Sequence, residues 1–299
     1  MACFKLGTPD DVKAMDLEIK VPGVLEEAPE EDQKVMFCGM SIMRKARARS
    51  VSLSCEKSLS KLPTEVRAEN LPSVVGQLHW IATTVAMDES YHIGLAARLQ
   101  HVEVTVAVDV VNDVLNVIKA KPPVLEYGPV NLTEEAKIVC HSDASWAPKH
   151  ESFWSTAAHK IYVSDGQVDF PVHWRSKRLS AVCASSAAAE IRAAVKACHE
   201  AKMMQMLMSE VMGKKVPLEL NVDASVAMTH VKSKFALLPQ DRSYVIDVRM
   251  LRQLIKDDQW PTTMWWVQGT ANRADDITKP TRWKIKNALK SLHTLVMPE

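Results

Sequence analysis

The spacing of apolar and polar residues changes character along this chain. Between residues 73 and 118, apolar side chains recur every three or four positions, a spacing that predicts helices. The clearest apolar face consists of Val104, Val108, Val111, Leu115 and Ile118. Residues 1–34 show no such period and hold three prolines and a run of acids, so we expect a poorly ordered, acidic leader there.

After residue 135, short apolar stretches alternate with amphipathic ones. The pattern predicts strands at 137–143, 158–163, 168–175, 217–223 and 262–268. It predicts helices at 186–211, 242–256 and 280–295. Ser185 or Ser186 can cap the first of these helices, and Gly213 follows its end. Three strands followed by alternating helices and strands indicate an α/β domain with a mixed sheet over 136–299, preceded by a mainly helical segment over 35–135.

The total charge conceals an uneven distribution. The 299 residues include 37 Lys and Arg against 36 Asp and Glu, a formal net charge of +1. Residues 136–299 hold 23 basic and 16 acidic side chains, net +7, whereas residues 1–34 hold 4 and 9, net −5. A basic second half is compatible with a polyanionic partner, although the total alone would argue against one.

Other features of the sequence bear on its surroundings. No apolar run approaches the roughly 18 residues that span a bilayer, so no membrane association is expected. No secretory signal opens the chain, and the six cysteines are scattered without a Cys-x-x-Cys pair. We expect an intracellular protein, cytoplasmic or nuclear, in a reducing environment.

Four acidic residues stand at the ends of predicted elements. Asp143 and Asp223 each end a strand, Glu190 lies in the first turn of the long helix, and Asp275 precedes the last helix. Residues at one edge of a sheet can converge, and clustered carboxylates favour Mg²⁺ or Mn²⁺. Two such ions about 4 Å apart promote phosphodiester cleavage. On spacing alone, such acids are more often turn residues or helix-dipole partners.

Short motifs give these acids a context. They read SDASWA at 142–147, WRSKR at 174–178, SSAAAE at 185–190, LNVDASVA at 220–227, IDVR at 246–249 and NRADDITKP at 272–280. In content and order they resemble the ribonuclease H domain of copia-type retrotransposon polyproteins. The resemblance implies a ribonuclease H-like fold, a mixed five-stranded sheet flanked by helices. It also implies an endonuclease that hydrolyses the RNA strand of RNA–DNA hybrids.

The resemblance assigns roles to particular residues. The implied catalytic residues, which would also bind two Mg²⁺ or Mn²⁺ ions, are Asp143, Glu190, Asp223 and Asp275. The expected contacts to the RNA–DNA hybrid are Trp146, Arg175, Lys177 and Arg178. Three further tryptophans are expected in the core: Trp174, Trp265 and Trp266.

The resemblance extends upstream. Residues 37–40 (FCGM) and 73–82 (SVVGQLHWIA) are similar to the end of the copia reverse transcriptase and to the segment before its ribonuclease H. We therefore interpret 35–135 as a reverse transcriptase C-terminal or connection remnant and 136–299 as the ribonuclease H-like domain. The remainder of a Pol polyprotein is then a candidate partner. The polymerase's Y-x-D-D motif is absent, so no polymerase activity is expected.

Several positions depart from the family pattern. Ala187, Ala188, Ala224 and Val245 stand where the family has Thr, Glu, Asn and His. Loss of such supporting residues commonly costs about 10–100-fold in metal affinity or activity. One alternative is therefore a catalytically degenerate retroelement fragment that binds nucleic acid without cleaving it. Another is an integrase-type strand transferase, but the order Asp, Glu, Asp, Asp and the lack of zinc-binding His/Cys pairs favour ribonuclease H.

Overall fold

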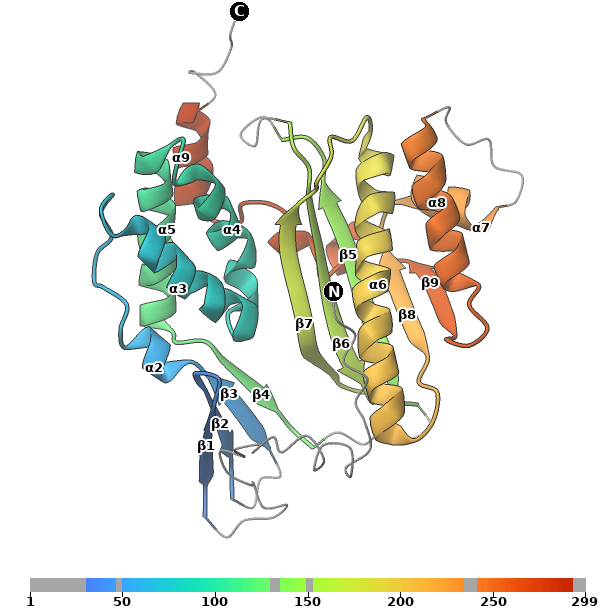
Figure 1. Ribbon diagram of the computed structural model, residues 1–299, viewed down its shortest axis with the longest axis horizontal. Coiled ribbons are helices and arrows are strands. Elements are labelled where there is room, and N and C mark those ends of the chain that lie inside the picture. The colour runs from blue at the N-terminus through green and yellow to red at the C-terminus, as the bar shows by residue number, and fades with distance from the viewer. Residues whose placement is uncertain (1–30, 47–49, 130–134, 149–152, 234–240, 293–299) are drawn as a thin grey trace, which may run out of the picture.

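The computed structural model describes residues 31–46, 50–129, 135–148, 153–233 and 241–292 (Figure 1). These residues form two sheets, a four-stranded one in the order β1-β2-β3-β4 and a five-stranded one in the order β7-β6-β5-β8-β9. Figure 1 shows α3, α4, α5 and α9 grouped to one side of the five-stranded sheet. In the described part of the chain, no helix combines the length and apolarity needed to cross a membrane.

The four-stranded sheet is antiparallel throughout and was not predicted. Its strands are β1 (Gln33–Phe37), β2 (Met40–Arg44), β3 (Val51–Ser54) and β4 (Val124–Tyr127). Most of its side chains are exposed or only half-buried, so the sequence lacks the clean alternation that marks a strand. Most of the expected leader, residues 1–30, lies outside the described residues, and Gln33 and Lys34 belong to β1.

The helical segment predicted over 73–118 is present, divided into separate helices. The elements between β3 and β4 are α2 (Glu56–Leu59), α3 (Leu71–Thr84), the 3-10 turn η1 (Met87–Glu89), α4 (Ser90–Leu99) and α5 (Val104–Ala120). In α5, Val111, Leu115 and Ile118 are buried as predicted. Val104 is exposed. The buried face of α5 also includes Val106, Ala107, Val110 and Val114, so it lies to one side of the predicted stripe.

The five-stranded sheet confirms the predicted fold class. Its strands are β5 (Lys137–Ser145), β6 (Thr156–Ser164), β7 (Asp169–Arg178), β8 (Leu218–Val222) and β9 (Thr262–Trp266). Strands β5, β6 and β7 are antiparallel neighbours, and β8 runs parallel to both β5 and β9. The helices are α6 (Ser186–Met212), α7 (Ser225–Lys232), which was not predicted, and α8 (Arg242–Ile255). This mixed sheet flanked by helices has the ribonuclease H-like arrangement.

Helix α6 has clear signals at both ends and lies close to the sheet. Ser185 is its N-cap: the side chain accepts a hydrogen bond of 3.2 Å from the N–H of Ala188. Gly213 ends the helix with φ of 64°, a left-handed conformation that favours glycine. The inner face is rich in small buried residues, namely Ala189, Ala194, Ala197, Cys198 and Ala201. These allow close packing on β5, with which α6 shares a core.

The segment after β9 joins the two units of the structure. After β9 the chain passes through the 3-10 turns η3 (Gly269–Ala271) and η4 (Asp275–Ile277) to α9 (Trp283–Leu292). Ile285 and Leu289 of α9 belong to the core of the N-terminal helices. The Arg282 guanidinium donates hydrogen bonds of 2.6 and 2.9 Å to the two carboxylate oxygens of Glu89. Although it lies in the predicted second domain, α9 therefore packs on α5.

The assignment of the α6 cap can be tested with two adjacent serines. Replacing Ser185 by Ala removes the acceptor for the Ala188 N–H, so we expect a loss of about 1 kcal/mol in the free energy of unfolding. Ser186→Ala, one residue inside the helix, is the matched control and should change it by less than about 0.5 kcal/mol. Urea denaturation followed by circular dichroism measures both. Equal losses in the two variants would show that the cap is assigned wrongly.

Candidate active site

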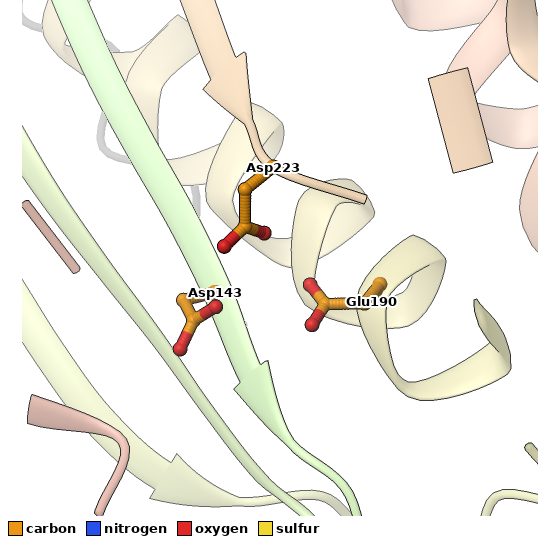
Figure 2. Close-up of side chains that lie close together, drawn as sticks. All are labelled: Asp143, Glu190 and Asp223. Carbon is orange, nitrogen blue, oxygen red and sulfur yellow. The ribbon is translucent and has the colours of Figure 1, made fainter. Parts of the chain in front are cut away.

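Three acidic side chains converge where β5, β8 and α6 meet. Carboxylate oxygens of Asp143, Glu190 and Asp223 all lie within 4.8 Å of one another (Figure 2). Asp143 comes from β5, Asp223 directly follows β8, and Glu190 projects from α6. Since β5 and β8 are neighbouring parallel strands covered by α6, the topology itself brings the three together.

Two details of the expected placement were wrong. Asp143 does not end its strand, because β5 continues to Ser145. Glu190 is the fifth residue of α6 and so lies just beyond the first turn of the helix. The first turn itself contains no acidic residue. The long β5–β6 ladder, in which Asp143 pairs with Ala158 and Ser145 with Thr156, extends the strand past the point suggested by hydrophobicity. Despite these two differences, the three carboxylates lie close together, as expected.

Burial and mutual repulsion oppose ionisation of this cluster. Burial, then the charges of Asp143 and Asp223, raise the pKa of Glu190 to about 9. Burial also raises the pKa of Asp143 to about 6, although the hydrogen bond from Thr278 acts in the opposite direction. The pKa of Asp223 is raised as well, again chiefly by burial. The charge of Lys279 lowers the pKa of Asp143 and Asp223 but does not outweigh burial. At neutral pH Glu190 therefore stays protonated, and all three groups do not ionise together.

The donor chemistry fits a hard divalent cation. All three groups offer carboxylate oxygens, which Mg²⁺ and Mn²⁺ prefer. Within the described residues, no lysine or arginine forms an ion pair with Asp143, Glu190 or Asp223. A bound cation would supply the missing charge, so these three residues can hold a metal ion.

Asp275, the fourth predicted acid, is not part of this three-residue cluster. It lies in η4, and its Oδ1 is 2.6 Å from the Nζ of Lys279. The hydrogen bond and charge of Asp275 raise the pKa of Lys279. Asp275 is still near enough for its charge to contribute to the raised pKa values of Asp143 and Glu190. The structure thus places Asp275 beside the cluster, paired with a cation.

Several residues that support the cluster were not identified from sequence. The Thr278 hydroxyl donates a 2.6 Å hydrogen bond to Oδ2 of Asp143. The buried side-chain amide of Asn272 donates to the backbone oxygen of Ser142, at 2.9 Å. Both residues belong to the motif at 272–280, from which only the acid was assigned a role. That motif was the signal that could have revealed them.

Close packing also fixes Asp223. A Cβ atom at Gly269 would lie 3.2 Å from Oδ2 of Asp223, so glycine leaves room for this carboxylate. The indole N–H of Trp266 donates a 2.8 Å hydrogen bond to the backbone oxygen of Asp223. Trp266 and Trp265 are each about half exposed, so their expected place in the core was wrong, because β9 is the edge strand. Trp174 is buried as expected.

The residues expected to contact nucleic acid have diverse surroundings. Trp146 is 48% exposed, and its indole N–H donates to the backbone oxygen of Cys183. Arg175 forms a 3.1 Å ion pair with Glu200 of α6. The guanidinium of Arg178 lies over the Trp154 ring, 4.8 Å from its centroid. Lys177 is exposed on β7. Despite these different partners, Arg175, Lys177 and Arg178 all line one pocket of about 680 Å³, together with Arg98 and Trp154.

Comparisons with protein families and with curated proteins find no match. Among solved structures, the N-terminal RNase H domain of Rv2228c from Mycobacterium tuberculosis, fused to maltose-binding protein, is 12% identical, with a TM-score of 0.37. RNase H1 from the archaeon Halobacterium salinarum is 16% identical, with a TM-score of 0.34. LC11-RNase H1, in complex with an RNA/DNA hybrid, is 13% identical, with a TM-score of 0.36. Each alignment covers 52% of this chain and 98–99% of the other. Because these identities and TM-scores are low, the fold is assigned from the strand order of this chain and not from its similarity to these structures.

Proposed function

We propose that this chain is a metal-dependent endonuclease that hydrolyses the RNA strand of RNA–DNA hybrids. The observation that carries the proposal is the meeting of Asp143, Glu190 and Asp223 within 4.8 Å on a ribonuclease H-like sheet. An all-carboxylate cluster, buried at Asp143 and half-buried at Glu190 and Asp223, matches the chemistry of phosphodiester hydrolysis, in which a cation must accompany the phosphate.

The proposed catalytic group is Asp143, Glu190, Asp223 and Asp275, holding two Mg²⁺ or Mn²⁺ ions. When bound, such ions activate water and stabilise the charge on the phosphoryl oxygens. Water adds to phosphorus as the bond to the 3′ oxygen breaks, leaving a 3′-hydroxyl and a 5′-phosphate. Thr278 keeps the Asp143 carboxylate in place by hydrogen bonding. Lys279 holds Asp275 at the margin of the cluster.

The proposed substrate contacts are Trp146, Arg175, Lys177 and Arg178. A hybrid duplex is recognised through its shape, phosphates and 2′-hydroxyls rather than its base sequence. The exposed Trp146 lies just beyond the end of β5, the strand that carries Asp143, which is compatible with a place beside the substrate. The basic side chains of β7 suit phosphate contacts.

The wider biological setting is also a proposal. A copia-type Pol origin, with a reverse transcriptase remnant before the nuclease, is supported by the motifs in the sequence alone. Five cysteines in the described residues, Cys38, Cys55, Cys140, Cys183 and Cys198, are free thiols. Free thiols favour a reducing compartment, either the cytoplasm or the nucleus.

A second candidate function is binding of nucleic acid without cleavage. The ion pair of Asp275 with Lys279 favours it, because it engages the fourth carboxylate with a side-chain cation. The alanines at 187, 188 and 224 point the same way, since they replace supporting polar residues.

Cleavage of a labelled RNA–DNA hybrid with Mg²⁺ tests the two candidates. We expect activity in the unmodified chain and a loss of at least about 100-fold in Asp143→Asn, because removal of one group that stabilises the transition state commonly has this effect. Glu219→Gln is the matched control: Glu219 lies on β8 but forms a partly exposed pair with Lys137, so activity should be retained.

The outcomes separate the candidates. Salt-dependent hybrid binding with no cleavage by the unmodified chain would favour the second function. Equal cleavage by the unmodified chain and Asp143→Asn would contradict the proposed catalytic cluster.

The crowding of carboxylates predicts an unusual pH dependence when divalent cations are removed by chelation. Because the folded state raises the pKa of Glu190 from 4.5 to about 9, protonated Glu190 favours folding. Its contribution is full below pH 4.5 and is lost as the pH rises through about 9. Protonated Asp143 likewise favours folding, because its pKa is raised from 3.8 to about 6, and this contribution is lost as the pH rises through about 6. The free energy of unfolding should therefore fall between pH 5 and 9.

Urea denaturation in a chelator measures this dependence. Glu190→Gln should flatten the curve, whereas Glu219→Gln should leave its slope unchanged. Addition of Mg²⁺ should raise stability most at high pH, where the carboxylates are ionised. A chelated protein with constant stability from pH 5 to 9 would contradict the crowding described for this cluster.

A further inference from the structure

A polar cavity lies on the five-stranded sheet, away from the carboxylates. It has a volume of about 290 Å³ and lies between α6 and the outer strands β6 and β7. Its polar lining consists of His159, Arg175, Lys177, Lys196, His199 and Glu200. Two small residues, Ala157 and Ala193, complete the wall and leave the space open.

The strand register explains why these side chains meet. His159 pairs with Arg175, and Ala157 pairs with Lys177, so all four side chains share one face of the sheet. Lys196 and Glu200 are four residues apart on α6 and therefore occupy one side of that helix. The cavity is thus built by regular elements.

Positive charge exceeds negative charge in this cavity. Glu200 is its single carboxylate and pairs with Arg175 at 3.1 Å. In the described parts of the chain, neither Lys177 nor Lys196 has an ion-pair partner. Burial, followed by the charges of Lys177, Arg192 and Arg175, lowers the pKa of Lys196. The lysines therefore repel one another with no anion between them.

One residue of the lining, His159, also holds a buried polar atom without a partner in the described residues. His159 is 5% exposed, and within the described residues its Nε2 has no hydrogen-bond partner. Burial, His173 and Arg175 lower the pKa of His159 to about 3, so the ring is neutral at physiological pH. A neutral imidazole has one N–H to donate. Buried polar atoms without partners are uncommon and call for a missing ligand or water.

We propose that this cavity binds a phosphate group through Lys177, Lys196 and Arg175. A phosphate offers several acceptor oxygens and negative charge to these cations, and it leaves further oxygens for His159. A metal ion is the wrong occupant, because the lining is cationic and the described residues contain one metal-binding group, at Asp143.

The position of the cavity suggests two sources of phosphate. Lys196 is six residues beyond Glu190 on α6, which corresponds to a rise of about 9 Å along the helix. A free phosphate or a backbone phosphate of a bound hybrid can both reach such a site. The second source rests on the proposed function, whereas phosphate binding itself does not.

Isothermal titration with inorganic phosphate, without divalent cations or nucleic acid, tests the cavity. Lys196→Gln should weaken phosphate binding by about tenfold or more, since a hydrogen bond to a charged group contributes at least that factor. Arg175→Gln, at a half-exposed side chain, provides a second variant that should weaken it too. Lys61→Gln, an equal charge change at an exposed residue outside the cavity, should leave it unchanged. In the unmodified protein, phosphate should shift the ring signals of His159 and His199 in NMR spectra.

Measuring the binding of an RNA–DNA hybrid in the presence of a chelator distinguishes a backbone phosphate from a free phosphate as the ligand of the cavity. If Lys196→Gln also weakens hybrid binding and reduces its salt dependence by about one counterion, the cavity holds a backbone phosphate. If hybrid binding is unchanged while phosphate binding is lost, the cavity serves free phosphate. Absence of phosphate binding and of the histidine shifts in the unmodified protein would overturn the proposal. Loss of hybrid cleavage alone would count against the nuclease function and not against this site.

Discussion

Repulsion among three carboxylates, one buried and two half-buried, is the constraint around which this structure is organised. Asp143, Glu190 and Asp223 share a space in which their oxygens lie within 4.8 Å, and burial strengthens the repulsion. A chain that only needed to fold would gain by separating them. The surrounding structure holds them together instead, which is the usual mark of a site kept for its chemistry rather than for stability.

The supporting elements act from two directions. From one side, the small residues of α6 let Glu190 approach β5 and β8. From the other side, the segment after β9 supports the cluster through two hydrogen bonds. The Thr278 hydroxyl donates to Asp143, and the Asn272 side-chain amide donates to the backbone oxygen of Ser142. This segment is held by its own contacts: buried Lys160 of β6 lies 2.8 Å from Asp276. The geometry of the cluster thus depends on residues far apart in sequence.

The sequence predicted the second half of the chain well because its periodicity is strong. For example, the helix predicted over 242–256 is found as α8, and its regularly spaced Tyr244, Val248 and Leu251 are all buried. It failed for the four-stranded sheet, whose shallow burial leaves no alternation to detect. The sequence also did not predict the pairing of Asp275, since a lysine four residues away faces either solvent or the acid according to the tertiary packing. The exposure of the β9 tryptophans depends likewise on which strand forms the edge.

The contacts of Arg282 have a consequence for the autonomy of the two units. Its guanidinium lies against Glu89 and Asp113, so one side chain from the end of the chain forms ion pairs with two acids of the N-terminal helical segment. A polypeptide cut at residue 135 would leave Arg282 without either carboxylate and would expose the apolar face of α9. The helices before the ribonuclease H-like sheet therefore help to anchor the end of the chain, and with it the segment that carries Thr278.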